Sequence, residues 1–160
     1  METKLTHRTI PSTISPLDAH IGFWMRFVSN QVSAEFARAV EARGVSVSDW
    51  VALRTLYDSA ESTHAELVAS LGMTKGAVSK VVSRLQDKGL VTRVTHAGDA
   101  RAQVLALTRA GRALVPALAR DADANDQRFF GQLPAKQRAQ LKSLLQEIAQ
   151  FHQLTQVPVA

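Results

Sequence analysis

The residues from Lys75 to Lys88 have types and a spacing suited to contact with a polyanion. At helical periodicity, Val78, Val82 and Leu85 fall on one face, and the opposite face carries small, hydroxyl and cationic side chains. Small residues allow close approach of a backbone to DNA, while hydroxyls and cations can contact phosphates or base edges. We therefore predict that a set of residues faces the major groove, namely Lys75, Ala77, Ser79, Lys80, Ser83 and Arg84.

A second candidate contact is the pair Asp99 and Arg101 beside Gly98. An arginine is attracted into a narrow minor groove by its negative potential, and a neighbouring carboxylate can hold the guanidinium extended. On its own, a D-x-R sequence is equally compatible with an ordinary turn. Its position at the tip of an expected hairpin is what favours a DNA contact for this pair.

Helices and strands must position these side chains. Thr63-x-x-Glu66 fits a capping box that starts a short helix ending at Gly72, and Thr74 can cap a second helix that ends before Gly89. Residues 90–95 and 103–107 then predict a β-hairpin with a glycine-containing tip. Two close helices followed by a hairpin are the order of a winged helix-turn-helix.

The flanking segments read as helices around this lobe. Apolar residues recur at helical spacing from Leu17 to Arg43, in a second segment after Ser46 or Ser48, from Thr108 to Leu133, and after Pro134. Pro116 should kink or restart its helix. We expect a mainly α fold with a small β-hairpin wing (α+β), comprising a flexible arm at 1–16 and one domain at 17–160. Within it, 47–108 form the DNA-binding lobe, and 17–46 and 109–160 form a dimerisation region.

Composition narrows the function classes. The chain has 160 residues, no cysteine and a net charge of +5. The excess of cations over anions falls between Thr63 and Arg112, so we expect a polyanion-facing surface there rather than a basic tail. No cysteine ligand set, histidine pair, nucleophile motif or phosphate loop is visible, so we predict no enzyme, metal or cofactor. We find no secretory or membrane segment and expect a cytoplasmic protein.

The segment from Trp50 to Arg112 resembles the MarR family of bacterial winged-helix regulators, and the flanking helices extend the resemblance to nearly the whole chain. The matching motifs, in order, are Thr63-x-x-Glu66-Leu67, Leu71-Gly72, Val78-Ser79-Lys80-Val81-Val82-x-Arg84-Leu85-x-x-Lys88-Gly89-Leu90-Val91, Asp99-x-Arg101 and Leu107-Thr108-x-x-Gly111. The resemblance implies a homodimer with recognition helices in successive major grooves and wings in the flanking minor grooves. Ala100 departs from the second arginine common at such wings.

The resemblance also implies a crevice for a small, often aromatic and anionic ligand between the dimer helices and the DNA-binding lobe. We take as its candidate lining His20, Phe23, Trp24, Phe27, Trp50 and Arg54. Arg54 would pair with the anion. The alternative is that the aromatic residues are plain core.

The sequence therefore predicts a homodimeric, sequence-specific transcriptional regulator that binds double-stranded DNA at an inverted repeat. We expect repression, with a small, aromatic or anionic ligand as the candidate effector. The alternative is a winged-helix module for protein interaction or small-molecule binding with little specific DNA binding. The two differ in salt dependence, because neutralising DNA phosphates releases counterions.

Overall fold

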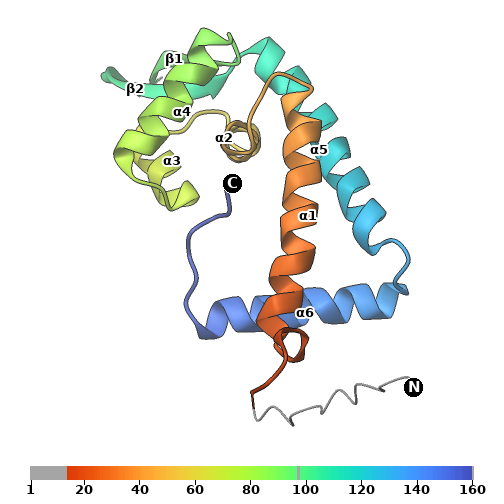
Figure 1. The fold of residues 1–160 in the computed structure, drawn as a ribbon. Helices are drawn as coiled ribbons and strands as arrows, with labels where there is room; N and C mark the ends of the chain where they lie inside the picture. The colour runs from red at the N-terminus through yellow and green to blue at the C-terminus, as the bar shows by residue number, and fades with distance from the viewer. Residues whose placement is uncertain (1–13, 97, 160) are drawn as a thin grey trace, which may run out of the picture. The chain divides into compact units, whose positions relative to one another are not determined.

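The computed structural model describes residues 14–96 and 98–159, with the backbone alone for residues 96 and 99–102. Contacts divide the chain into two units, Met1–Gln31 and Val32–Ala160, each of which is described by itself. The helix α1 (Ile21–Glu41) contributes its first half to one unit and its second half to the other. Figure 1 shows the order of the elements along the chain.

The first unit, over its described residues, holds a short 3-10 helix (η1, Leu17–Ala19) and the start of α1. The sequence predicted one continuous helix from Leu17, but the backbone of His20 is extended and separates the two. The indole N–H of Trp24 donates to the carbonyl of Asp18 at 2.8 Å and fixes this junction. The ring of Trp24 also packs edge-on against those of Phe23 and Phe27.

Three helices of the second unit form the helix-turn-helix and its support: α2 (Val47–Tyr57), α3 (His64–Leu71) and α4 (Lys75–Asp87). Their starts are fixed by the predicted side-chain caps. The hydroxyls of Ser46, Thr63 and Thr74 each accept from a backbone N–H three residues later. Gly72 ends α3 in the left-handed conformation, with φ of 61°, as expected for a glycine cap.

The wing is an antiparallel hairpin of β1 (Val91–His96) and β2 (Asp99–Leu107), in which Val91 pairs with Leu107 and Val94 with Val104. The register shifts between Thr95 and His96, near the tip. Ser62 adds a bridge on the other side of β2 by exchanging two backbone hydrogen bonds with Leu105. The hairpin is therefore tied to the chain that enters α3.

Two further helices follow, α5 (Arg109–Phe130) and α6 (Ala135–Phe151). The Thr108 hydroxyl caps α5, and it donates to the carbonyl of Gly89 at 2.7 Å. Gly111 is required here, because a Cβ would collide with the carbonyl of Leu90. Pro116 lies inside α5, so the helix does not restart there.

The core of the second unit lies between α2, α3, α4, the hairpin and the first half of α5. Its largest fully buried side chains are Leu53, Leu56, Leu67, Leu71, Leu85, Leu105 and Leu118. This core leaves the outer faces of α4 and the wing free. Over the residues that the structure describes, no helix is both long and apolar enough to cross a membrane.

Candidate nucleic-acid interface

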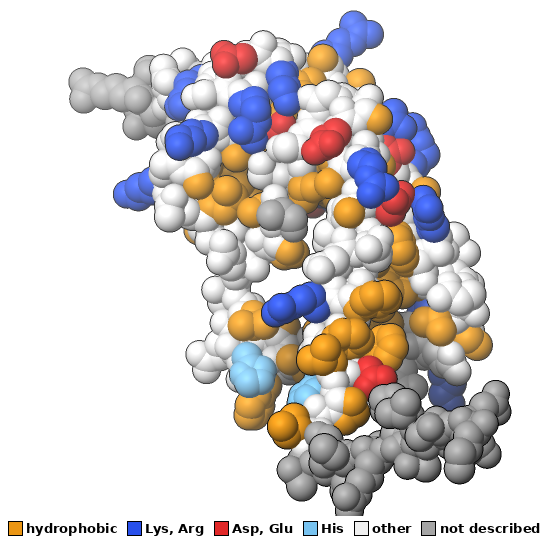
Figure 2. Space-filling view, viewed as in Figure 1, with side chains coloured by type: hydrophobic (Ala, Val, Ile, Leu, Met, Phe, Trp, Pro, Cys, Tyr) orange, Lys and Arg blue, Asp and Glu red, His pale blue; other side chains and the backbone are white. Residues whose placement is uncertain are grey.

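The two faces of α4 differ sharply in burial. Val78, Val82 and Leu85 are completely buried, and Val81 is nearly so. Opposite them, the exposed residues are Lys75, Gly76, Ser79, Lys80 and Ser83, with Ala77 half-buried. Figure 2 shows Lys and Arg side chains gathered over the part of the molecule that contains α4 and the wing. The separation of faces predicted for residues 75–88 is therefore present in the fold.

Ser79 is oriented by a neighbour on α3. Its hydroxyl lies 3.0 Å from Nε2 of His64, the first residue of α3. The hydrogen bond joins the outer faces of the two helices, so a serine on the candidate DNA-facing surface is already directed by a side chain from the preceding helix. The sequence gives no local signal for this contact of His64, because its partner lies fifteen residues further along the chain.

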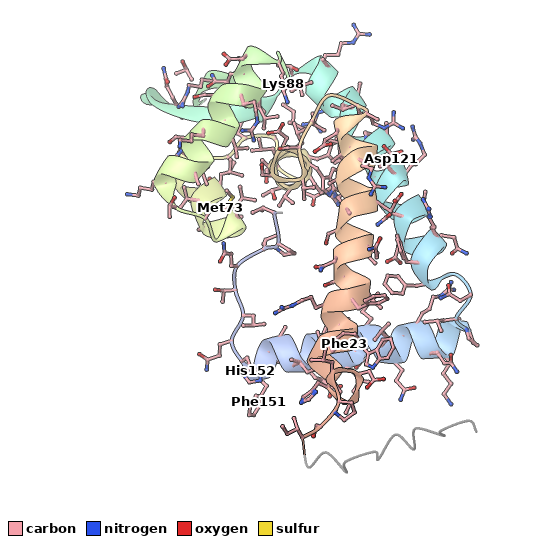
Figure 3. The ribbon with its side chains drawn as sticks, viewed as in Figure 1. Phe23, Met73, Lys88, Asp121, Phe151 and His152 are labelled. Carbon is pink, nitrogen blue, oxygen red and sulfur yellow. The ribbon has the colours of Figure 1, made fainter. Side chains whose placement is uncertain are left out.

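Arg84 lies in a different environment from the one expected for a groove-facing residue. Its Nε and Nη2 donate to Oδ1 of Asp49 at 2.8 and 2.6 Å, and Nη2 also donates to the Ser48 hydroxyl at 3.1 Å. Lys88 reaches the other oxygen of Asp49 at 2.9 Å; Figure 3 labels Lys88 at the end of α4. In this arrangement both cations fasten the recognition helix to α2.

Asp49 is fully buried, and its ionised form is nevertheless favoured. Burial by itself raises the pKa of this carboxyl, but the hydrogen bonds from Arg84, Lys88 and the backbone N–H of Ser46 outweigh burial and hold the pKa below its ordinary value. Asp49 is also the third residue of α2 and closes its capping box with Ser46. One carboxylate thus supports the start of α2 and the position of α4.

The wing forms a two-stranded projection beside α4, and its first strand, β1, packs against that helix. The backbone places Asp99 and Arg101 at the start of β2, next to the tip. Their side chains lie outside the described part of the structure. Arg93 of β1 is a further exposed cation on the wing.

The predicted ligand residues are distributed over both units. His20, Phe23, Trp24 and Phe27 belong to the first unit, where His20 Nδ1 lies 3.2 Å from the carbonyl of Pro16. Trp50 and Arg54 belong to the second. Arg54 pairs with Asp58 at 2.7 Å, and Trp50 packs edge-on against Phe36.

Trp50 lines a cavity of about 350 Å³ within the second unit. Its walls come from α1, α2, α5 and the segment after α6. Among the described residues, no group of three or more His, Cys, Asp or Glu side chains is placed to hold a metal ion.

The helix α4 has one buried face, follows α3 after a tight turn, and is adjoined by the β1–β2 hairpin. This arrangement defines a winged helix-turn-helix, a class of DNA-binding protein. A family model described as "MarR family" matches residues 43–102. The chain is 29% identical to the HTH-type transcriptional repressor Rv2887 of Mycobacterium tuberculosis, over 82% of this chain and 94% of the relative. It is 26% identical to the HTH-type transcriptional repressor NicR of Pseudomonas putida, over 92% and 95%.

Solved structures agree with the sequence relatives. CouR from Rhodococcus jostii, in a crystal structure bound to p-coumaroyl-CoA, superposes with a TM-score of 0.73 at 27% identity, covering 85% of this chain and 96% of CouR. The crystal structure of Rv2887 gives a TM-score of 0.65 at 28% identity, covering 82% and 95%. Residues 43–102 of this chain thus match the MarR family, and most of the chain is similar in sequence and fold to transcriptional regulators such as Rv2887 and CouR.

Proposed function

We propose that the protein is a homodimeric repressor that binds an inverted-repeat operator and blocks access to a promoter. The observation that carries this proposal is the outward face of α4, which combines small, hydroxyl and cationic residues while the opposite face is buried. A two-fold dimer presents two such helices, which suits half-sites about 10–10.5 base pairs apart from centre to centre. The naming of Rv2887 and NicR as repressors supports repression.

Within this proposal, the exposed residues Lys75, Ser79, Lys80 and Ser83 of α4 contact the major groove, together with the half-buried Ala77. The amino end of α4 adds backbone N–H groups that favour a phosphate. Arg84 acts as a positioning residue, because its guanidinium is bonded to Asp49. Arg101, positioned by Asp99, extends from the wing into the minor groove.

A second copy of the chain is the partner that the exposed apolar residues favour. In the first unit these are Leu17, Ile21, Trp24, Met25, Phe27 and Val28. On α6 they are Leu141, Leu144, Leu145, Ile148 and Phe151. Large apolar patches on two helical segments are typical of surfaces that a partner covers. We assign both to the homodimer interface, as the family resemblance implied.

A small-molecule effector would act by favouring one spacing of the two recognition helices over another. Support comes from CouR, whose structure holds p-coumaroyl-CoA, and from Bordetella bronchiseptica BpsR, whose DNA binding is regulated by 6-hydroxynicotinic acid. The bacterial regulators to which the chain is similar also support a non-enzymatic role in the cytoplasm, where genomic DNA lies.

Salt dependence tests the DNA-binding proposal. If the dimer neutralises six or more phosphates, affinity for its operator should fall about 10³-fold or more between 50 and 200 mM salt. A flat response, with no preference for any sequence, would instead support the interaction-module alternative. Fluorescence anisotropy with a labelled duplex and an unrelated competitor measures both properties.

A further inference from the structure

The two exposed serines of α4 differ in their surroundings. The hydroxyl of Ser79 lies 3.0 Å from Nε2 of His64 on α3. Ser83 lies one helical turn further along the same exposed face, and within the described residues its hydroxyl has no hydrogen-bond partner. One serine on the candidate DNA-contacting surface is therefore engaged by the protein, and the other is free to rotate.

The fold holds the contact between His64 and Ser79 from both sides. His64 is the first residue of α3, and its backbone is fixed by the capping box in which Thr63 and Glu66 bond to each other's backbone N–H. Thr74 caps the start of α4 in the same way. The two helices pack beside each other (Figure 1), and the ring of His64 is half-buried. The hydroxyl of Ser79 therefore meets the imidazole before any DNA is bound.

The chemistry of the two groups sets the direction of this hydrogen bond. A serine hydroxyl has one hydrogen and two lone pairs, and a neutral imidazole has one N–H and one accepting nitrogen. The imidazole nitrogen is the stronger base of the two acceptors, and a serine paired with Nε2 of a histidine ordinarily donates to it. If Ser79 donates its only hydrogen to His64, the oxygen presents only lone pairs to the DNA.

A side chain that can only accept selects its partner by chemistry. Phosphate oxygens are themselves acceptors, so they offer such a serine no hydrogen bond. In the major groove, the donors on the base edges are the amino groups at N4 of cytosine and N6 of adenine, whereas guanine and thymine present acceptors there. A freely rotating hydroxyl, as in Ser83, can bond to any of these groups.

We propose that His64 is a positioning residue that makes Ser79 an acceptor only, so that Ser79 selects an adenine or a cytosine in each half-site. Ser83 has no such partner and contributes affinity without this selection. The DNA contact rests on the proposed function, whereas the direction of the hydrogen bond between His64 and Ser79 does not.

NMR spectra of the imidazole nitrogens test the direction of the hydrogen bond without DNA. Spectra are recorded at about pH 8, where histidine is ordinarily uncharged, and His64→Gln assigns the signals of His64. We expect Nε2 of His64 to carry no hydrogen in the parent and in Ser83→Ala, and to gain N–H character in Ser79→Ala. A hydrogen on Nε2 in the parent, or identical spectra for S79A and the parent, would overturn the proposal.

Selection of duplexes from a random pool tests the effect on DNA. The parent should prefer adenine or cytosine over guanine or thymine by about fivefold at a position where S79A has no preference. His64→Ala should lose the same preference and S83A should keep it. H64Q should also keep it, because the glutamine amide extends to the position of Nε2 and accepts there, whereas the shorter His64→Asn should lose it. Affinity for unrelated DNA should be unchanged in H64A.

A double-mutant cycle shows whether His64 acts through Ser79. The H64A/S79A variant should bind the operator within about twofold of S79A alone, since the two residues form one unit. Independent losses in the two single variants, full preference in H64A, or a preference for guanine or thymine would overturn this inference alone. A parent protein that enriches no sequence would overturn the proposed function, and with it the DNA contact of Ser79.

Discussion

Asp49 and Arg84 join the first turn of α2 to the recognition helix, with Nη2 of Arg84 2.6 Å from Oδ1 of Asp49. The next residue along α2 is Trp50, which lines the cavity. A displacement of α2 by a ligand would therefore be transmitted directly to α4 through this ion pair. Such a connection supplies the physical contact that coupling between a ligand site and a DNA-contacting surface requires.

Replacing Asp49 should destabilise the DNA-binding lobe. Asp49→Ala removes a helix cap and the charged partner of Arg84 and Lys88, whose side chains are partly exposed and can be rehydrated. We expect a loss of about 2–3 kcal/mol in the free energy of unfolding, measured in urea. Asp58→Ala, at the other end of α2, breaks the exposed pair with Arg54 and should cost less than about 1 kcal/mol. Equal losses would show that Asp49 is not a structural anchor.

Acid should weaken the fold partly through Asp49. Its pKa is lowered in the folded protein, so its stabilising contribution is present above its ordinary value of 3.8 and is lost as pH falls through the lower folded value. The hydrogen bond from Arg43 likewise lowers the pKa of Asp121, which adds to the same acid dependence. Between pH 5 and pH 2, we expect the melting temperature of Asp49→Asn to fall less steeply than that of the parent. Parallel curves would contradict this assignment.

Lys80 should contact a DNA phosphate. Lys80→Ala should weaken binding to operator and unrelated DNA alike and reduce the log–log salt slope by about one for each protomer. Lys136→Ala removes an exposed lysine from the first turn of α6 and should leave the slope unchanged. A full slope in K80A, or an equal loss in K136A, would remove Lys80 from the interface.

Ile148 should lie within the homodimer interface. It is 46% exposed in the single chain, and burying a carboxylate there without a partner would be strongly unfavourable. We expect Ile148→Asp to dissociate into monomers, or to lose its fold, at micromolar concentration in light scattering. Gln150→Asp adds the same charge at another exposed position of α6 and should remain dimeric. A stable I148D dimer would place α6 outside the interface.

Local signals allowed much of this fold to be predicted. Thr63, Thr74 and Thr108 cap helices because their hydroxyls reach amides three residues ahead, and that spacing is legible in sequence. The buried face of α4 follows equally from helical periodicity. The outline of the winged helix therefore depends on short-range chemistry.

Contacts between residues far apart in the chain could not be predicted from the sequence. Arg84 satisfies every local criterion for a DNA contact, yet Asp49 lies thirty-five residues away and receives its guanidinium. Nothing in the spacing of either residue indicates that pairing. The sequence also does not predict that Val157 and Trp50 line the same cavity. Residues 155–159, which follow α6, have no periodic pattern that would indicate where they pack. His20 and Trp50, which the resemblance placed in one crevice, belong to separate units here.

Selection of bound duplexes from a random pool tests most directly whether this chain reads DNA as a two-fold dimer. The enriched sequences should contain two inverted half-sites centred about 10–10.5 base pairs apart, and the Lys80→Ala variant should recover them less efficiently. Enrichment of a single asymmetric site, or of no sequence at all, would contradict the assignment of α4 and the wing as paired readers of an operator.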